Sequence, residues 1–185
     1  MKRAGPQIAV AELVERHYEM LYRYAYRLSG SAADAEDLVQ ETFVRAQAKL
    51  GQVRDAERVS AWLFSILRNL YLQRLRSERQ AVIVPLEDVV EPCEEPSDPL
   101  PEIDQELLQA ALNELPESFR TPLILFYFDE LSYREIAEEM DLPIGTVMSR
   151  LARAKGHLRA RLQPMLAGAG SSSGKDMERR QHNGV

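Results

Sequence analysis

The chain has 185 residues, of which 45% are hydrophobic and 28% charged, as in an ordinary soluble globular protein. No apolar run approaches the roughly 20 residues that a membrane-spanning helix needs, and the start of the chain lacks a signal-peptide pattern, so we expect a cytoplasmic protein without membrane insertion. The single cysteine, Cys93, excludes an internal disulfide, and the net charge of −6 gives no direct sign of a nucleic-acid-binding protein.

The segment from residue 8 to residue 79 predicts three helices. In the first, large side chains recur at helical spacing until Ser29 and Gly30 end it. Ser31 is suited to cap the second helix, whose first turn carries acids that favour the positive end of the helix dipole. Ser60 is predicted to cap the third, which is at first apolar on nearly all sides and therefore buried. This helix then becomes basic, with Arg68, Arg74, Arg76 and Arg79.

Residues 80–104 are predicted to form an extended linker. The segment contains five prolines, which lack an amide donor, and it is rich in acids, which repel one another. Nine acids and no base lie between Glu87 and Glu106, and without them the rest of the chain has a net charge of +3. Because the distribution of charge matters more than its total, the acidic balance does not exclude a partner such as DNA.

Residues 105–166 predict a second helical domain, and the Gly- and Ser-rich residues 167–185 predict a flexible tail. Within this domain, Ser132 and Glu135 have the spacing of a capping box, in which each side chain bonds the other's free backbone amide. The segment Asp141–Gly145 then interrupts the helix, because Asp tolerates a left-handed backbone and Pro143 cannot continue a helix. The pattern predicts a helix-turn-helix.

The second helix of this motif is predicted to be a basic recognition helix. We expect Thr146 to cap it, and Val147 and Leu151 to pack inward. The outward-facing side chains would then be Met148, Ser149, Arg150, Ala152, Arg153 and Lys155. Arginine can bond guanine through two atoms or neutralise phosphate, and serine can contact phosphate or a base. The predicted DNA contacts are therefore Thr146, Ser149, Arg150, Arg153 and Lys155, and the alternative is a solvated basic helix.

Three stretches in order resemble the bacterial RNA polymerase sigma factors of the extracytoplasmic-function group of the sigma-70 family. They are residues 34–43, residues 61–69, and the segment from Leu115 through the helix-turn-helix to Ala154. The resemblance implies an all-α chain of two small helical domains. Residues 8–79 would correspond to sigma region 2, residues 80–104 to the linker, and residues 105–166 to sigma region 4.

The resemblance also implies two further surfaces on the first domain. A polymerase-binding surface would be formed by Asp34, Asp37, Leu38, Gln40 and Glu41, although Leu38 also suits the core; the alternative is a capped helix with a solvated face. A surface for the −10 promoter element would be formed by Trp62, Arg68, Asn69, Arg74 and Arg76. Trp62 is expected to pack in the core and to support this surface from there. The alternative for the basic residues is a solvated helix end. Residues 52–59 could hold a flipped base, as in similar proteins.

One residue departs from the pattern that similar recognition helices show. Where they often have a basic or polar residue, this chain has Met148. Direct reading of the −35 element would therefore shift to Ser149, Arg150 and Arg153.

The leading functional interpretation is a promoter-specificity subunit that binds core RNA polymerase, recognises the −35 and −10 elements and helps to melt promoter DNA. An anti-sigma factor is a further partner that the resemblance implies. The alternative is a sigma-like decoy that binds an anti-sigma factor without binding DNA, but a decoy would not need the basic residues of both domains. A simple repressor or activator would leave the Trp62 region unused. No catalytic residues, metal ligands or cofactor motifs occur at telling spacings, so we expect no enzyme.

Overall fold

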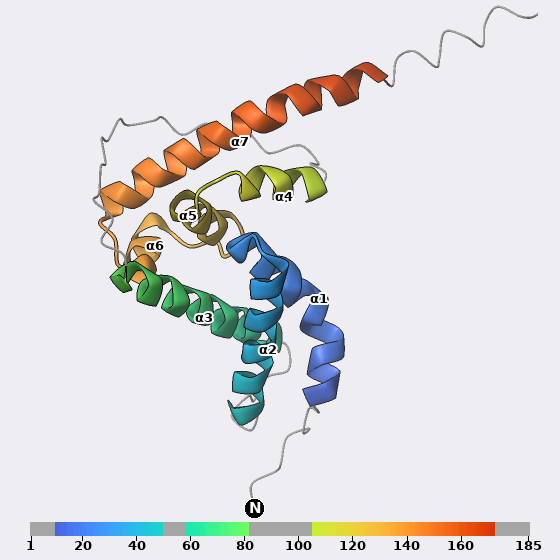
Figure 1. The fold of residues 1–185 in the computed structure, drawn as a ribbon, viewed down its shortest axis with the longest axis vertical. Coiled ribbons are helices and arrows are strands. Elements are labelled where there is room, and N and C mark those ends of the chain that lie inside the picture. Colours follow the sequence, from blue (N-terminus) through green and yellow to red (C-terminus); the bar gives the residue numbers. More distant parts are fainter. Residues whose placement is uncertain (1–9, 50–57, 82–104, 173–185) are drawn as a thin grey trace, which may run out of the picture.

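The computed structural model describes residues 10–49, 58–81 and 105–172, and within these ranges all regular elements are helices. Figure 1 shows two groups of them. The N-terminal lobe consists of α1 (Val10–Ser29), α2 (Ala32–Lys49) and α3 (Val59–Ala81). The C-terminal lobe consists of α4 (Gln105–Asn113), α5 (Glu117–Tyr127), α6 (Tyr133–Met140) and α7 (Ile144–Ser172). The predicted all-α class is confirmed.

The N-terminal lobe is a three-helix unit in which α2 packs on both α1 and α3. Leu21, Leu38 and Leu63 are almost fully buried, one from each helix. Gly30 ends α1 with a positive φ of 72°, and Ser31 caps α2, its hydroxyl accepting a bond from the amide of Asp34 at 3.4 Å. Both boundaries were predicted, because glycine adopts the left-handed conformation without strain and serine is a favoured N-cap.

The prediction that Ser60 caps α3 is wrong, since the helix already begins at Val59. Val59 is buried, so its packing against the core holds the first turn in place before the serine is reached. The loop 52–59 and the linker with Cys93 lie almost entirely outside the described residues.

The C-terminal lobe ends in the predicted helix-turn-helix, formed by α6 and α7. Ser132 and Glu135 form both bonds of the capping box, and Asp141 adopts the left-handed conformation at φ 53° and ψ 53°. Thr146 does not cap α7, because the helix begins at Ile144 and the amide of Thr146 bonds the carbonyl of Pro143. Proline suits this place since it lacks an amide that would need a partner.

The last helix is longer than the sequence predicted. We expected a flexible tail from residue 167, but α7 continues to Ser172. Residues 173–185 lie outside the described ranges. None of the helices within those ranges is long and apolar enough to span a membrane.

The two lobes lie against each other, although a linker between separate domains was predicted. Helix α1 contacts α4 and α5, and α3 contacts α6 (Figure 1). The buried apolar side chains of both lobes belong to one continuous core, which runs from Leu13 in α1 to Ala154 in α7. The described structure is thus a compact arrangement in which each lobe covers part of the other.

Candidate nucleic-acid interface

The helix-turn-helix is held together by a small apolar core and a well-capped first helix. Ile136, Val147 and Leu151 are buried between α6, α7 and the neighbouring α5. The hydroxyl and backbone amide of Ser132 bond the carboxylate of Glu135 and lower its pKa, so that the exposed acid stays charged. A negative charge is favourable here, because the first turn of α6 is the positive end of the helix dipole. The cap therefore fixes where α6 begins, and the left-handed Asp141 fixes where it ends.

The outer face of α7 differs from the predicted one. Ser149 and Arg150 are only 5% and 8% exposed, so their predicted outward orientation is wrong, and Thr146 is also buried. Arg150 follows Val147 by three residues and precedes Ala154 by four, which places it along the inward-facing stripe of a helix. The arginine was assigned outward from its charge, although its spacing matched the core.

Only part of the predicted recognition surface is displayed. Arg153 is exposed, and the half-buried Lys155 holds its ammonium 4.9 Å from the ring centre of Phe126, a favourable cation–π distance. The first turns of the helix instead display Ile144 and Met148, each 50% exposed. The surface near the start of α7 is therefore apolar, with cations farther along.

The basic half of α3 carries the residues predicted to contact the −10 element. Asn69 and Arg76 are exposed, whereas Trp62 is half-buried against the core, as predicted. Arg68 lies against the other lobe, with its guanidinium 3.6 Å from the carboxylate of Asp129 and 3.8 Å from that of Glu139. Carboxylates thus occupy the place beside Arg68 that a phosphate would need.

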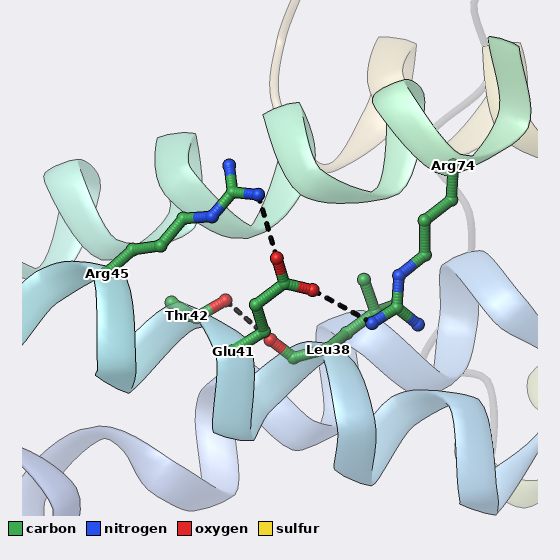
Figure 2. Close-up of polar contacts among 5 residues, drawn as sticks. All are labelled: Leu38, Glu41, Thr42, Arg45 and Arg74. Atoms are coloured by element: carbon green, nitrogen blue, oxygen red, sulfur yellow. Dashed lines mark hydrogen bonds and ion pairs between the residues drawn. The ribbon is translucent and has the colours of Figure 1, made fainter. Parts of the chain in front are cut away.

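Another arginine of α3, Arg74, is bound within its own lobe. Figure 2 shows Glu41 of α2 between the guanidinium groups of Arg45, at 2.7 Å, and Arg74, at 3.0 Å. Burial alone would raise the pKa of Glu41, but the bonds from the two arginines together outweigh it and lower the pKa. Glu41 is therefore a charged bridge between α2 and α3.

The predicted polymerase-binding surface on α2 divides into exposed and internal residues. Asp34, Asp37 and Gln40 are exposed, but Leu38 is only 1% exposed, so it belongs to the core and cannot contact a partner. Its carbonyl accepts a bond from the buried hydroxyl of Thr42 at 2.7 Å (Figure 2). Sequence reasoning missed Val44, an apolar side chain that is 65% exposed one turn after Gln40.

A polar cluster joins α1 and α3 to the connection between α5 and α6. The hydroxyl of Tyr24 donates to Asp129 at 2.5 Å, and Arg68 lies on the same carboxylate. Burial raises the pKa of Asp129, and the bond from Tyr24 and the charge of Arg68 offset this only in part. Burial and Asp129 raise the pKa of Tyr24 well above its ordinary value, so its hydroxyl stays a proton donor.

A second cluster joins the end of α1 to α5. Arg120, which is 8% exposed, donates to the carbonyls of Leu28 at 3.1 Å and Ser29 at 2.8 Å. These carbonyls lie at the negative end of α1, where a cation is favourable. A side chain on Gly30 would not fit here, because its Cβ would lie 2.7 Å from the guanidinium of Arg120.

Tyr71 of α3 completes this second cluster. Its hydroxyl contacts the carbonyl of Leu28 at 3.1 Å, the carboxylate of Glu117 at 2.8 Å and the hydroxyl of Thr121 at 2.9 Å. Sequence reasoning did not identify this cluster. The available signal was the polar stripe of Glu117, Arg120 and Thr121, which are spaced three and four residues apart on the largely apolar α5.

A cavity of about 490 Å³ lies between the lobes, beside the first cluster. Its walls include Arg23, Arg27, Phe64, Arg68, Phe128 and Asp129. The guanidinium of Arg27 lies 4.3 Å from the ring centre of Phe128, and burial together with the charge of Arg23 lowers its pKa. Among the described residues no group of three or more His, Cys, Asp or Glu could hold a metal ion.

Comparisons with known proteins agree on one family. The family models for sigma-70 region 2 and sigma-70 region 4 match residues 13–81 and 105–158. The ECF RNA polymerase sigma factor SigW of Bacillus subtilis is 30% identical over 175 residues, which cover 88% of this chain and 94% of SigW. The ECF RNA polymerase sigma factor SigL of Mycobacterium tuberculosis is 36% identical over 156 residues, which cover 83% of this chain and 88% of SigL.

One solved structure is similar over both lobes. The sigma factor RpoE from Bartonella quintana, crystallised in complex with the anti-sigma factor NepR, is 30% identical to this chain. The match has a TM-score of 0.51 and covers 83% of this chain and 96% of the other.

Proposed function

Because this chain belongs to the extracytoplasmic-function sigma factors of the sigma-70 family, we propose that it acts in the cytoplasm as a subunit that binds core RNA polymerase and gives it promoter specificity. The observation that carries this proposal is the presence of both sigma regions in one chain, the second ending in a capped helix-turn-helix. Sigma factors are specificity subunits, and the chain is accordingly not an enzyme.

We assign recognition of the −35 element to the N-terminal half of α7. A recognition helix presents this half to the major groove, and Arg153 and Lys155 would neutralise phosphates beside it. Thr146, Ser149 and Arg150 are buried in the compact arrangement, so their predicted contacts with DNA require that this part of the helix be uncovered.

Binding of the −10 element is assigned to the basic half of α3. Asn69 and Arg76 are already exposed. Arg68 would exchange the carboxylates of Asp129 and Glu139 for phosphate, which requires the two lobes to separate. Arg74 would likewise leave Glu41 or reach DNA while still bound to it. Trp62 would support the surface from within the core.

Contact with core polymerase is assigned to the exposed face of α2. Asp34, Asp37 and Gln40 provide polar and acidic groups, and Val44 provides an apolar side chain on the same face. Such a mixture suits a basic partner surface, since charge complementarity steers association while the apolar contact is desolvated. Glu41 would act from the edge of this face, because it is half-buried.

An anti-sigma factor is a further proposed partner. The similar RpoE of Bartonella quintana was crystallised with the anti-sigma factor NepR. The compact arrangement offers such a partner surfaces of both lobes at once. The alternative function, a decoy that binds an anti-sigma factor without DNA, is disfavoured because the chain keeps Asn69 and Arg76 exposed on α3 and Arg153 exposed on α7.

Run-off transcription with purified core polymerase and genomic promoter fragments tests the proposal. The complete chain should direct initiation from a defined set of promoters. Arg153→Ala should weaken binding to the −35 element while binding to core polymerase is retained. If the chain never directs initiation but binds an anti-sigma protein tightly, the decoy function replaces the proposed one.

A further inference from the structure

The start of α7 displays a pair of apolar side chains that the proposed function does not explain. Ile144 and Met148 are each 50% exposed and lie four residues apart, so they are neighbours on one face of the helix. Scattered single apolar residues are normal on a protein surface. Two adjacent exposed apolar side chains at the start of a recognition helix instead suggest a contact with a partner.

The surface beside this pair is open. A Cβ atom on Gly145 would meet no other atom within 4 Å. The absence of a side chain there lets another molecule approach the helix backbone between Ile144 and Met148. By contrast, Ser149 and Arg150, the polar groups expected to read bases, are covered.

The charge of α7 itself fits DNA better than an apolar protein partner, and on the other side Ile144 borders a hollow lined by Arg134, Glu138 and Asp141. Helix α7 contains no acid, and its cations lie after Met148 in the chain: Arg150, Arg153, Lys155, Arg159 and Arg161. An apolar tip followed by cations matches a major groove, whose floor carries base edges and whose rim carries phosphates.

The apolar group that a major groove offers is the C5-methyl group of thymine. Cytosine, adenine and guanine present only hydrogen-bond donors and acceptors at that edge. A thioether and an aliphatic side chain make no hydrogen bond with these groups, but they bury a methyl group favourably.

We propose that Ile144 and Met148 read thymine methyl groups in the −35 element, and that Met148 is the main determinant of this preference. This inference rests on the proposed function, because it concerns the same helix and the same DNA. It names the base class that the helix selects, which neither the sequence nor the family supplies.

Replacing thymine by deoxyuridine removes the methyl group and leaves the hydrogen-bonding edge unchanged, so it isolates the proposed contact. We would form holoenzyme from the complete chain and core polymerase and select −35 sequences from a randomised promoter library. Thymine should be enriched at one or more positions. Replacement of an enriched thymine by deoxyuridine should weaken promoter binding roughly fourfold, the effect of one buried methyl group.

The variant Met148→Ala should bind the thymine and deoxyuridine promoters almost equally. Leu107→Ala, which shortens another exposed apolar side chain on α4, should keep the full preference of the wild type. Both positions are exposed, so equal thermal unfolding by circular dichroism would show that the variants are folded.

The outcomes separate this inference from the proposed function. If the holoenzyme initiates transcription but thymine and deoxyuridine promoters bind equally, the inference is overturned and the proposed function stands. The same conclusion follows if Met148→Ala keeps the full preference, or if it loses binding to core polymerase instead. A holoenzyme that initiates on no member of the library overturns both.

Discussion

The two helices proposed to contact DNA, α3 and α7, differ in what their surfaces present: paired cations on α3 and exposed apolar side chains on α7. On α3, the cations are engaged by acids of the protein: Arg74 by Glu41, and Arg68 by Asp129 and Glu139 across the lobe contact. On α7, the first two turns display Ile144 and Met148, and the helix contains no acid. If both helices bind DNA as proposed, DNA must displace carboxylates from Arg68 and Arg74 of α3, whereas at the start of α7 it meets apolar side chains.

The largest expected effect comes from breaking the contact that keeps the lobes together. Arg120→Ala removes the guanidinium donor from the carbonyls of Ser29 and Leu28, leaving Leu28 only the hydroxyl of Tyr71, and creates a buried cavity. We expect a loss of about 2–4 kcal/mol in the free energy of unfolding, measured by urea denaturation. Small-angle scattering should show a larger radius of gyration.

Arg134→Ala is the matched control, because Arg134 is exposed on α6. Its effect should stay within about 0.5 kcal/mol. If Arg120→Ala were as mild as this control, the polar cluster would not hold the lobes together.

A second change would make the tip of α7 resemble α3. Met148→Arg replaces the apolar side chain proposed to contact thymine by one that can bond guanine through two atoms. In selections with holoenzyme, we expect the preferred base to change from thymine to guanine, with about tenfold discrimination. Leu107→Arg adds the same charge on α4 and should leave the preference unchanged; a general gain in affinity without a change of base would contradict the assignment.

A third change concerns Asp129, the acid that forms an ion pair with Arg68. Asp129→Asn removes the charge that competes with phosphate, so the free chain should bind a single-stranded −10 oligonucleotide roughly threefold more tightly, as expected for one partly exposed ion pair. Fluorescence anisotropy measures this affinity. Glu130→Gln changes an exposed acid in the same connection and should have no effect.

The same variant tests the pH dependence of stability. Because the pKa of Asp129 is raised above its ordinary value of 3.8, the folded chain binds this proton more tightly than the unfolded chain. The contribution of Asp129 to stability should therefore fall as the pH rises from 3.8 through the raised pKa. Asp129→Asn should lack this decline; an identical pH profile in both proteins would exclude a raised pKa.

The smallest effect is expected at the ion pair within the N-terminal lobe. Arg74→Ala should raise the pKa of Glu41 toward its ordinary value of 4.5, as followed by NMR titration. The stabilisation from a lowered pKa is complete above the unfolded value of 4.5, so the difference in stability from wild type should shrink below pH 4.5 and vanish once the pH has fallen through the folded pKa. Both side chains are more than a third exposed, so the loss should stay below about 0.5 kcal/mol.

Arg76→Ala serves as the comparison, because the Nε of Arg76 bonds the carbonyl of Leu72 and no carboxylate. It should leave the pKa of Glu41 unchanged. An unchanged pKa in Arg74→Ala as well would mean that Arg45 alone holds the carboxylate.

Several features that depend on neighbours in the chain were predicted correctly from the sequence, but the caps placed at Ser60 and Thr146 were not. The capping box of Ser132 and Glu135, the left-handed Asp141 and the end of α1 at Gly30 all follow from local backbone chemistry. Contacts between distant residues were not predictable in this way. Arg120 and Leu28 are 92 positions apart, and the sequence around either residue does not indicate that the two form a hydrogen bond.

Errors at the site had a different cause. Ser149 and Arg150 were placed outward because they are polar, and Leu38 was placed in an interface because the family has one there. The helical spacing of Arg150 with Val147 and Ala154 predicts burial, so periodicity was the better guide for that residue. Val44 was missed because an apolar residue is normally assigned to the core.

The bond from Arg120 to the end of α1 has a consequence for how opening could be observed. Arg120, which belongs to the other lobe, bonds the last carbonyls of α1, so when the lobes part the carbonyl of Ser29 loses this donor and that of Leu28 keeps only Tyr71. The final turn of α1 should then fray, and the amide of Gly30, bonded to the carbonyl of Tyr26, should exchange its hydrogen with solvent. The hydrogen-exchange rate of the Gly30 amide would thus report how often the two lobes separate.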